Sequence, residues 1–268
     1  MIDIAVNLLH QRFAADREEV LQRATAAGVA SMLITSTDLN ATEKAIAYCE
    51  LHDMFCTAGI HPHDANGAAE KYVDELTLLA QSDRVKAIGE TGLDFNRNFS
   101  PPATQRDIFS QQLRLACELQ KPVFVHDRDS NGEVYDQLHE FDKELNGVVI
   151  HCFTGTRTDL HRYLEAGYFI GITGWVCDVR RGEELRSMIP DIPLEQLLVE
   201  TDAPFLKPHT VPADWQANLS RRNSKRNEPA LLCYVIAQIA QLHECEPNTI
   251  AAITTRNALT LFDLPEPG

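Results

Sequence analysis

The sequence lacks the cysteine patterns that would indicate a covalent or zinc-stapled scaffold. Its seven cysteines are an odd number, spread from Cys49 to Cys245, and none forms a C-x-x-C pair. A disulfide framework and a zinc ribbon both require paired cysteines, so neither is expected. Scattered free thiols are typical of a reducing compartment, and we expect the protein to be cytoplasmic.

Long apolar runs are also absent. The N-terminus has neither the basic stretch nor the unbroken apolar stretch of a secretory signal. No run approaches the roughly 18 apolar residues that a membrane span requires. We therefore expect a protein that is neither secreted nor bound to a membrane, and we expect it to be a monomer.

Positive charge is scarce. Lysine and arginine total 24 against 39 aspartates and glutamates, which gives a net charge of −15. This balance argues against a broadly basic surface for nucleic acid, but it is compatible with a small local footprint. The basic segment "SRRNSKRN" contains Arg221, Arg222 and Lys225, which would lie either in a solvated loop or along a nucleic-acid strand, with Trp215 available to stack on a base. Arg226 is expected to be structural.

Eight short apolar runs alternate with longer amphipathic segments. The runs are "IDIAVN", "ASMLITS", "FCTAGI", "VKAIGE", "PVFVH", "GVVIH", "YFIGIT" and "LLVET". Strands that alternate with helices imply parallel pairing, and eight such units predict an α/β protein of the (β/α)8 TIM-barrel class. We expect one domain over residues 1–268, with C-terminal helices at about 228–263 packed on the barrel.

An open, doubly wound sheet is the structural alternative. Such a sheet is expected to carry a glycine-rich phosphate loop after its first strand. Here the first strand is followed by "LLHQRF", which contains no glycine. The barrel is therefore the favoured prediction.

Polar side chains gather where the predicted strands end. In a βα barrel these ends face one mouth, where active sites are built. The residues are Asn7, His61, His63, Glu90, Asp94, His126, His151 and Asp202. Taken singly, a histidine here would be an ordinary hydrogen-bonded rim residue, and Asp94 or Asp202 a helix N-cap. The convergence of the four histidines with Glu90 and Asp202 instead predicts a metal centre, because buried charges are tolerated when they are paired or bind metal.

The kinds of ligand constrain the ion. Imidazole nitrogen combined with carboxylate oxygen suits zinc or manganese, whereas a site richer in oxygen and water suits magnesium. Arg128 follows the fifth strand, and its planar guanidinium suits bidentate contact with a phosphate. We expect Arg128 to help hold an anionic substrate.

Seven stretches of the chain resemble the TatD family of metal-dependent deoxyribonucleases, within the amidohydrolase-like barrels. They are "GIHPHD", "AIGETGLDFNRNFS", "PVFVHDRD", "HCFTGT", "GITGWVC", "LLVETDAPFL" and "RRNSKRNEP", and they span almost the whole chain. The resemblance implies a TIM barrel that hydrolyses phosphodiester bonds with a divalent cation. By position, it implies a metal site of Glu90, His126, His151 and Asp202, and it places His61 and His63 beside the substrate phosphate. With that site, Glu90 and Asp202 are expected to act in catalysis.

The first strand departs from the pattern of most of that family. Relatives begin with D-x-H-x-H, whose two histidines hold one of two metals, whereas this chain has Asp3, Ala5 and Asn7. The departure resembles a bacterial subgroup to which 3′ to 5′ exonuclease activity on single-stranded DNA and RNA is ascribed, and it implies a role in DNA repair or nucleic-acid turnover. We expect one tightly held metal, Mg²⁺ before Mn²⁺ or Zn²⁺. Asn7 is expected at the mouth, where its amide would orient a water or touch a weakly held cation, and it is expected among the substrate-binding residues.

Two other functions are compatible with such a barrel. One is an amidohydrolase that cleaves a C–N bond, although such barrels often bridge two metals with a lysine on the fourth strand, where this chain has Glu90. The other is a barrel that binds metal or nucleic acid without turnover, which only the missing histidine pair favours.

Overall fold

The computed structural model describes residues 1–213, 215 and 225–266. Its contacts divide the chain into two compact units. The first comprises Met1–Met32, Gly171–Leu259 and Pro265–Gly268, and the second comprises Leu33–Ile170 and Thr260–Leu264. The predicted nucleic-acid contacts of Arg221 and Arg222 lie outside the described residues.

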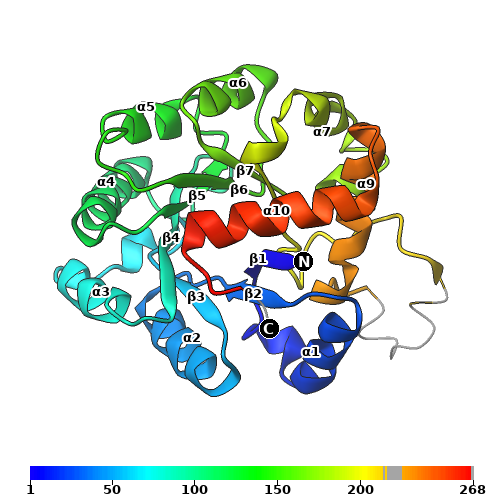
Figure 1. The fold of residues 1–268 in the computed structure, drawn as a ribbon. Helices are drawn as coiled ribbons and strands as arrows, with labels where there is room; N and C mark the ends of the chain where they lie inside the picture. The colour runs from blue at the N-terminus through cyan, green and yellow to red at the C-terminus, as the bar shows by residue number, and fades with distance from the viewer. Residues whose placement is uncertain (214, 216–224, 267–268) are drawn as a thin grey trace. The chain divides into compact units, whose positions relative to one another are not determined.

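The second unit is a run of parallel strands, each followed by a helix. Its complete strands are β3 (Phe55–Ala58), β4 (Val85–Asp94), β5 (Val123–Arg128) and β6 (Val148–His151). Its helices are α2 (Leu39–His52), α3 (Tyr72–Ala80), α4 (Pro102–Leu119), α5 (Glu133–His139) and α6 (Arg157–Glu165), which follow one another along the outside of these strands (Figure 1). Strand pairs are joined in parallel from β2 (Ser31–Ile34) through β7 (Phe169–Ile172).

The register between neighbouring strands of this unit aligns the polar residues at the strand ends. His126 on β5 pairs with His151 on β6, and Gly92 on β4 pairs with His126. Side chains that share a register position and face the same side of a sheet are neighbours. The two histidines therefore come to the same level of the sheet although 24 residues separate them.

The first unit joins the two ends of the strand sequence. Val6, the last residue of β1 (Ile2–Val6), forms a parallel bridge with Ala203, which follows β8 (Leu197–Val199). The backbone amide of Asn7 donates to the carbonyl of Ala203 at 2.8 Å, and that of Asp202 donates to the carbonyl of Ala5 at 2.9 Å. All five residues of β1 are buried, as its apolar sequence predicts.

These pairings give the fold class. The strands form one eight-stranded sheet in the sequential order β1 to β8, and the segment after β8 pairs with the end of β1. A sheet of parallel strands in sequential order, whose last strand meets its first, closes on itself, as a (β/α)8 barrel does. The predicted barrel class is confirmed, and a doubly wound sheet, whose strand order is not sequential, is excluded.

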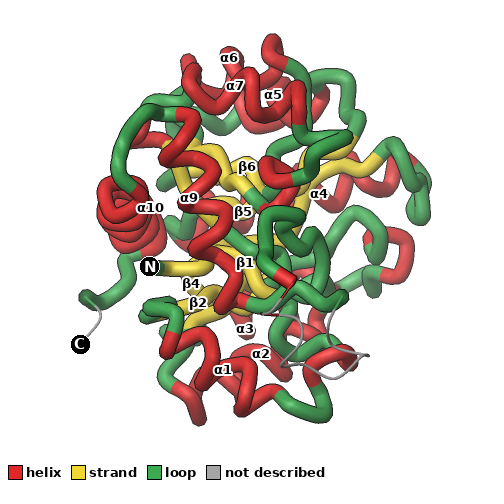
Figure 2. The backbone as a smooth tube through the Cα atoms, turned by 90° about the vertical axis from the view of Figure 1, so that its right-hand side faces the viewer, coloured by secondary structure: helices red, strands yellow, loops and turns green. Residues whose placement is uncertain are grey.

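The last helices of the first unit are where the sequence predicts them. A 3-10 turn at Pro229–Leu231 leads into α9 (Leu232–Leu242), which α10 (Pro247–Phe262) follows. Figure 2 shows both helices in red, with α10 near the N-terminus. The amide of Asn257 on α10 donates to the carbonyls of Leu194 and Leu197, both at 2.8 Å, which ties this helix to the start of β8.

Two further features concern the cysteines and the helices. All seven cysteines are free, so no disulfide contributes to the fold. Among the helices of the described residues, none combines the length and the apolar character needed to cross a bilayer.

Strand β4 is longer than the sequence predicts. The run "VKAIGE" indicates an end at Glu90, but the strand continues to Asp94, and its register against β5 shifts between Ile88 and Thr91. Gly89 and Gly92 take φ angles of +150° and +136°, which side-chain-bearing residues rarely adopt. These two glycines let the strand bend past Glu90 and continue, so Glu90 lies within the strand.

Candidate metal and phosphate site

One carboxylate oxygen is the meeting point of three histidines in the second unit. Oε1 of Glu90 lies 3.0 Å from Nδ1 of His126, 3.2 Å from Nε2 of His61 and 3.7 Å from Nε2 of His151. Burial opposes ionisation of Glu90, but the three imidazoles outweigh it and hold the pKa of this carboxyl well below its usual range. The structure thus brings together four residues that the sequence singled out.

The backbone around Glu90 requires glycine. A Cβ on Gly89 would lie 2.3 Å from the carbonyl oxygen of Phe124, and one on Gly59 would lie 2.5 Å from the carbonyl carbon of Gly89. Strands β3, β4 and β5 therefore approach one another more closely than side chains would allow. The amide of Glu90 donates to the carbonyl of Ser36 at 2.9 Å, which fixes the carboxylate's height.

Asp94 is a second carboxylate, and it contacts His63 and His126. Its Oδ2 lies 2.6 Å from Nε2 of His63 and 3.5 Å from Nε2 of His126. Its Oδ1 accepts the amides of Asn96 and Arg97 at 3.1 and 2.8 Å. Burial raises the pKa of Asp94, but the imidazoles of His126 and His63 and the amide of Arg97 outweigh burial and hold it below its usual range.

Asp94 was not among the site residues expected from the sequence, which allowed it an N-cap role. It caps a turn through Oδ1 while its other oxygen faces the histidines. One signal in the sequence pointed to Asp94. In "ETGLD", Glu90 and Asp94 are four residues apart, so a continuous strand places their side chains on the same side.

Two buried glutamines on α4 hold the loops that carry these groups. Gln112 accepts the amide of Ile60 at 2.8 Å and donates to its carbonyl at 2.9 Å, next to His61. Gln105 accepts the amide of Asp94 at 2.8 Å and donates to its carbonyl at 3.1 Å. Sequence reasoning missed both glutamines, because glutamine on a helix is usually a surface residue.

The tautomer of His61 follows from its neighbours. Nδ1 of His61 accepts the amide of His63 at 3.0 Å, so the ring proton lies on Nε2, facing Glu90. Burial lowers the pKa of His61 to about 4, and the charge of Glu90 only partly offsets it. His61 is therefore a neutral donor at physiological pH.

The environment of His126 fits a cation. Its Nε2 is buried and finds no hydrogen-bond partner among the described residues, although Asp94 lies close. Burial lowers the pKa of His126, but Asp94 and Glu90 outweigh burial and raise it to about 9. The ligand atoms of His61, Glu90 and His126 lie within 4.8 Å of one another. Because His61 carries its proton on Nε2, the carboxylate of Glu90 and the imidazole of His126 are the donors here that suit a divalent ion.

Arg128 ends β5, where it pairs in register with Asp94 of β4. Its guanidinium donates to Oγ1 of Thr154 at 3.0 Å, and its Nε lies 3.9 Å from Oδ1 of Asp129. The side chain is partly exposed, so it remains accessible to an anionic ligand.

The first unit brings together the two other predicted site residues. Nδ2 of Asn7 donates to Oδ1 of Asp202 at 2.8 Å. One layer deeper, the fully buried Asp3 accepts the amide of Thr201 at 2.8 Å and its hydroxyl at 2.5 Å. The polar face of the first strand therefore points at the segment that follows β8.

The expected structural role of Arg226 is confirmed. This buried guanidinium binds Asp16 through both carboxylate oxygens at 2.7 Å and Glu228 at 2.6 Å. It also lies over the ring of Phe13, 4.6 Å from the centroid. Arg226 thus ties the segment before α9 to the start of α1 (Arg17–Ala26) and is inaccessible to a nucleic acid.

The chain matches one protein family over nearly its full length. Residues 2–263 match the model of the TatD related DNases. A 3'-5' ssDNA/RNA exonuclease TatD of Citrobacter koseri is 45% identical over 265 residues, covering 98% of this chain and 99% of the relative. Another of the same name from Salmonella typhimurium is 44% identical, with the same coverage.

Solved structures also superpose on nearly the whole chain. YJJV, a TatD homolog from Escherichia coli K12, superposes with a TM-score of 0.87 at 28% identity, over 99% of this chain and 98% of the other. A TatD family hydrolase from Entamoeba histolytica superposes with a TM-score of 0.86 at 28% identity, over 98% of this chain and 97% of the other. An organophosphorus hydrolase variant from Deinococcus radiodurans superposes with a TM-score of 0.63 at 10% identity, which shows a shared fold alone.

Proposed function

The chain belongs to the family of TatD related DNases, and we propose that it is a 3′ to 5′ exonuclease that hydrolyses phosphodiester bonds of single-stranded DNA and RNA. Relatives 44 to 45% identical over their whole length carry that name. The observation that supports it best is Glu90, whose one oxygen lies within 3.7 Å of three imidazoles, with Asp94 behind them. Such a cluster suits a cation and a phosphate better than a packing role.

The proposed metal ligands are Glu90, His126 and His151 of the second unit. Asp202 is added because it lies in "LLVETDAPFL", one of the stretches that resemble the family. A bound divalent cation supplies positive charge that polarises the phosphoryl group and lowers the pKa of the attacking water. We propose Mg²⁺ before Mn²⁺ or Zn²⁺, since the first strand offers Asn7 in place of histidine.

The remaining groups have roles that their contacts support. His61, neutral with its proton on Nε2, donates a hydrogen bond to a phosphoryl oxygen, and His63, held by Asp94, supports the same phosphate. Arg128 contributes a further contact to the anion. Asp202 accepts a proton from the attacking water, and Asn7 fixes the rotamer of its carboxylate.

We also propose that the two units serve one catalytic domain. Strand β2 begins in the first unit and ends in the second, and β7 begins in the second and ends in the first. A domain boundary normally falls in an exposed linker rather than inside a strand. Cytoplasmic turnover of nucleic acid, including DNA repair, is the proposed setting, and the seven free thiols are compatible with it.

An end-labelled single-stranded oligonucleotide tests the function. The protein is assayed in chelator and then with Mg²⁺, Mn²⁺ or Zn²⁺ restored. We expect stepwise shortening from the 3′ end with metal and none in chelator, and we expect Glu90→Gln and His126→Ala to lose at least about a hundredfold in rate. His139→Ala, which removes an exposed histidine on α5, is the matched control and retains activity.

Two outcomes would overturn the proposal. Shortening that continues in chelator, or in the two variants, excludes the metal mechanism. Turnover of C–N substrates alone would favour an amidohydrolase, and metal or oligonucleotide binding without any product would favour a binding barrel.

A further inference from the structure

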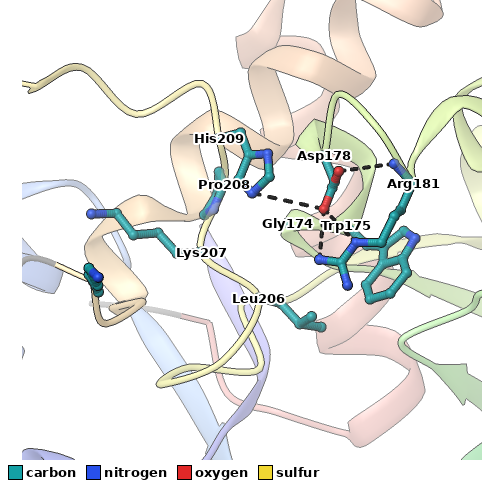
Figure 3. Close-up of a pocket in the computed structure, with 9 residues that line it drawn as sticks. Gly174, Trp175, Asp178, Arg181, Leu206, Lys207, Pro208 and His209 are labelled. Atoms are coloured by element: carbon teal, nitrogen blue, oxygen red, sulfur yellow. Dashed lines mark hydrogen bonds and ion pairs between the residues drawn. The ribbon is translucent and has the colours of Figure 1, made fainter.

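A cavity of about 450 Å³ lies wholly within the first unit. It opens between the 3-10 turn Gly174–Cys177, which follows β7, and the segment 206–209, which follows β8. Its walls are closely fitted, because a Cβ on Gly174 would lie 2.1 Å from the carbonyl oxygen of Leu206. Figure 3 shows the side chains that line it.

The cavity is basic in a strongly acidic protein. Four basic side chains and one carboxylate line it. The basic side chains are Arg181, Lys207, His209 and Lys225, and the carboxylate is that of Asp178. The chain as a whole carries a net charge of −15. A local excess of positive charge in such a protein favours an anionic ligand at this place.

The single carboxylate is already neutralised. Oδ2 of Asp178 lies 2.8 Å from Nη2 of Arg181, and Oδ1 accepts the amides of Arg180 and Arg181 at 2.9 and 3.0 Å. Burial raises the pKa of Asp178, but these contacts outweigh burial and lower it to about 2. Asp178 therefore orients Arg181 and adds little repulsion toward an anion.

An aromatic ring forms another wall. Trp175 is half-buried, and the guanidinium of Arg181 lies 4.4 Å from the centroid of its ring. In Figure 3 the two side chains lie against each other at the edge of the cavity. Farther along the same segment, Nζ of Lys207 lies 5.6 Å from the ring centroid of Trp215. Cations interleaved with indoles are the pattern by which proteins hold single strands without reading sequence.

We propose that this cavity holds one nucleotide of a single-stranded nucleic acid, with its base against Trp175 and its backbone phosphate between Lys207 and Lys225. The volume falls within the roughly 300 to 1,000 Å³ of small-ligand sites. This inference rests on the proposed function, to which it adds a binding site for the substrate strand outside the histidine cluster.

Binding is measured as fluorescence anisotropy of a labelled 20-nucleotide oligothymidylate, in chelator so that no turnover occurs. Lys207→Gln and Lys225→Gln are each expected to weaken binding about threefold to tenfold and to reduce the slope of log K against log salt by about one. Trp175→Leu is expected to weaken binding about tenfold while leaving that slope unchanged, because stacking releases no counterions. Lys143→Gln, an exposed lysine of the second unit, is the matched control.

Unchanged dissociation constants in all three variants would overturn the inference. An equal effect of Trp175→Leu on a duplex of the same length would overturn the stacking role, because paired bases are not available to the indole. Thermal unfolding checks that each variant is folded. Lys225 is exposed, so Lys225→Gln tests the binding site even if Trp175→Leu does not fold.

The two proposals fail separately. The wild-type protein is assayed in parallel for shortening of the same strand with Mg²⁺. If it binds the strand through these residues but does not shorten it, the proposed function fails and the binding site stands. If it shortens the strand and the three variants bind normally, the exonuclease stands and the binding site fails.

Discussion

Asn7 and Asp202, which are 195 residues apart in the chain, are joined by a hydrogen bond of 2.8 Å from the amide Nδ2 to the carboxylate Oδ1. The D-x-H-x-H pattern that the first strand was compared with has a histidine at the position of Asn7. The amide cannot act as an imidazole ligand, but it holds one oxygen of Asp202 in place. The first strand thus contributes to the proposed site by positioning a carboxylate.

Asn7→Ala is expected to lower kcat about tenfold to a hundredfold with a smaller change in KM, because a hydrogen bond to a charged group contributes about 1.5 to 3 kcal/mol. Asn7→Asp is expected to be worse, since it sets two carboxylates against each other. Steady-state kinetics on a single-stranded substrate measures both. Asn146→Ala removes an exposed amide and serves as the control. Equal kcat in wild type and Asn7→Ala would show that Asp202 needs no such partner.

Asp94→Asn tests the second carboxylate of the histidine cluster. Asparagine keeps an acceptor for the amides of Asn96 and Arg97 but removes the negative charge beside His63 and His126. We expect kcat to fall at least tenfold while the melting temperature changes little. Asp53→Asn, at a position 91% exposed, is the control. A large loss of stability with normal kcat would make Asp94 a purely structural residue.

Gly89→Ala tests the backbone that presents Glu90. The added Cβ would meet the carbonyl of Phe124 at 2.3 Å, at a φ of +150°. A strained conformation of this kind costs on the order of 3 kcal/mol, so we expect a clearly lower melting temperature and lost activity. Gly67→Ala is the matched control, because nothing lies within 4 Å of its Cβ position. The explanation fails if both variants unfold at the wild-type temperature.

Asp3→Asn tests the buried polar face of β1. Burial raises the pKa of Asp3 from 3.8 to about 7, and the hydrogen bonds from Thr201 only partly oppose it. The folded state therefore binds a proton that the unfolded state releases between pH 4 and 7, so this group's contribution to stability is full below pH 4 and is lost as pH rises through 7. The shift corresponds to about 4 kcal/mol across that window.

The measurement compares melting temperatures of Asp3→Asn and wild type from pH 4 to 8. Asparagine does not titrate, so the variant should gain stability relative to wild type as pH rises. Asp83→Asn, on an exposed aspartate, should show a constant difference. A constant difference for Asp3→Asn as well would mean that Asp3 does not take up its proton in this range.

The strands, the barrel class and most of the histidine cluster follow from local patterns in the sequence. Apolar runs with a period of two are local signals, and parallel strands in sequential order bring their ends to one side. Glu90, His126 and His151 could therefore be predicted from position alone. The family motifs added the likeness to nucleases, which the comparisons confirmed.

Which of these groups touch depends on how the whole chain folds. The extension of β4 to Asp94, the clamps made by Gln105 and Gln112, and the bond from Asn7 to Asp202 join residues that are far apart in the chain. Such contacts depend on register and on how closely strands approach at Gly89, which no local pattern encodes. The basic cavity beside Trp175 has the same origin, because its two walls follow different strands and meet only when the chain is folded.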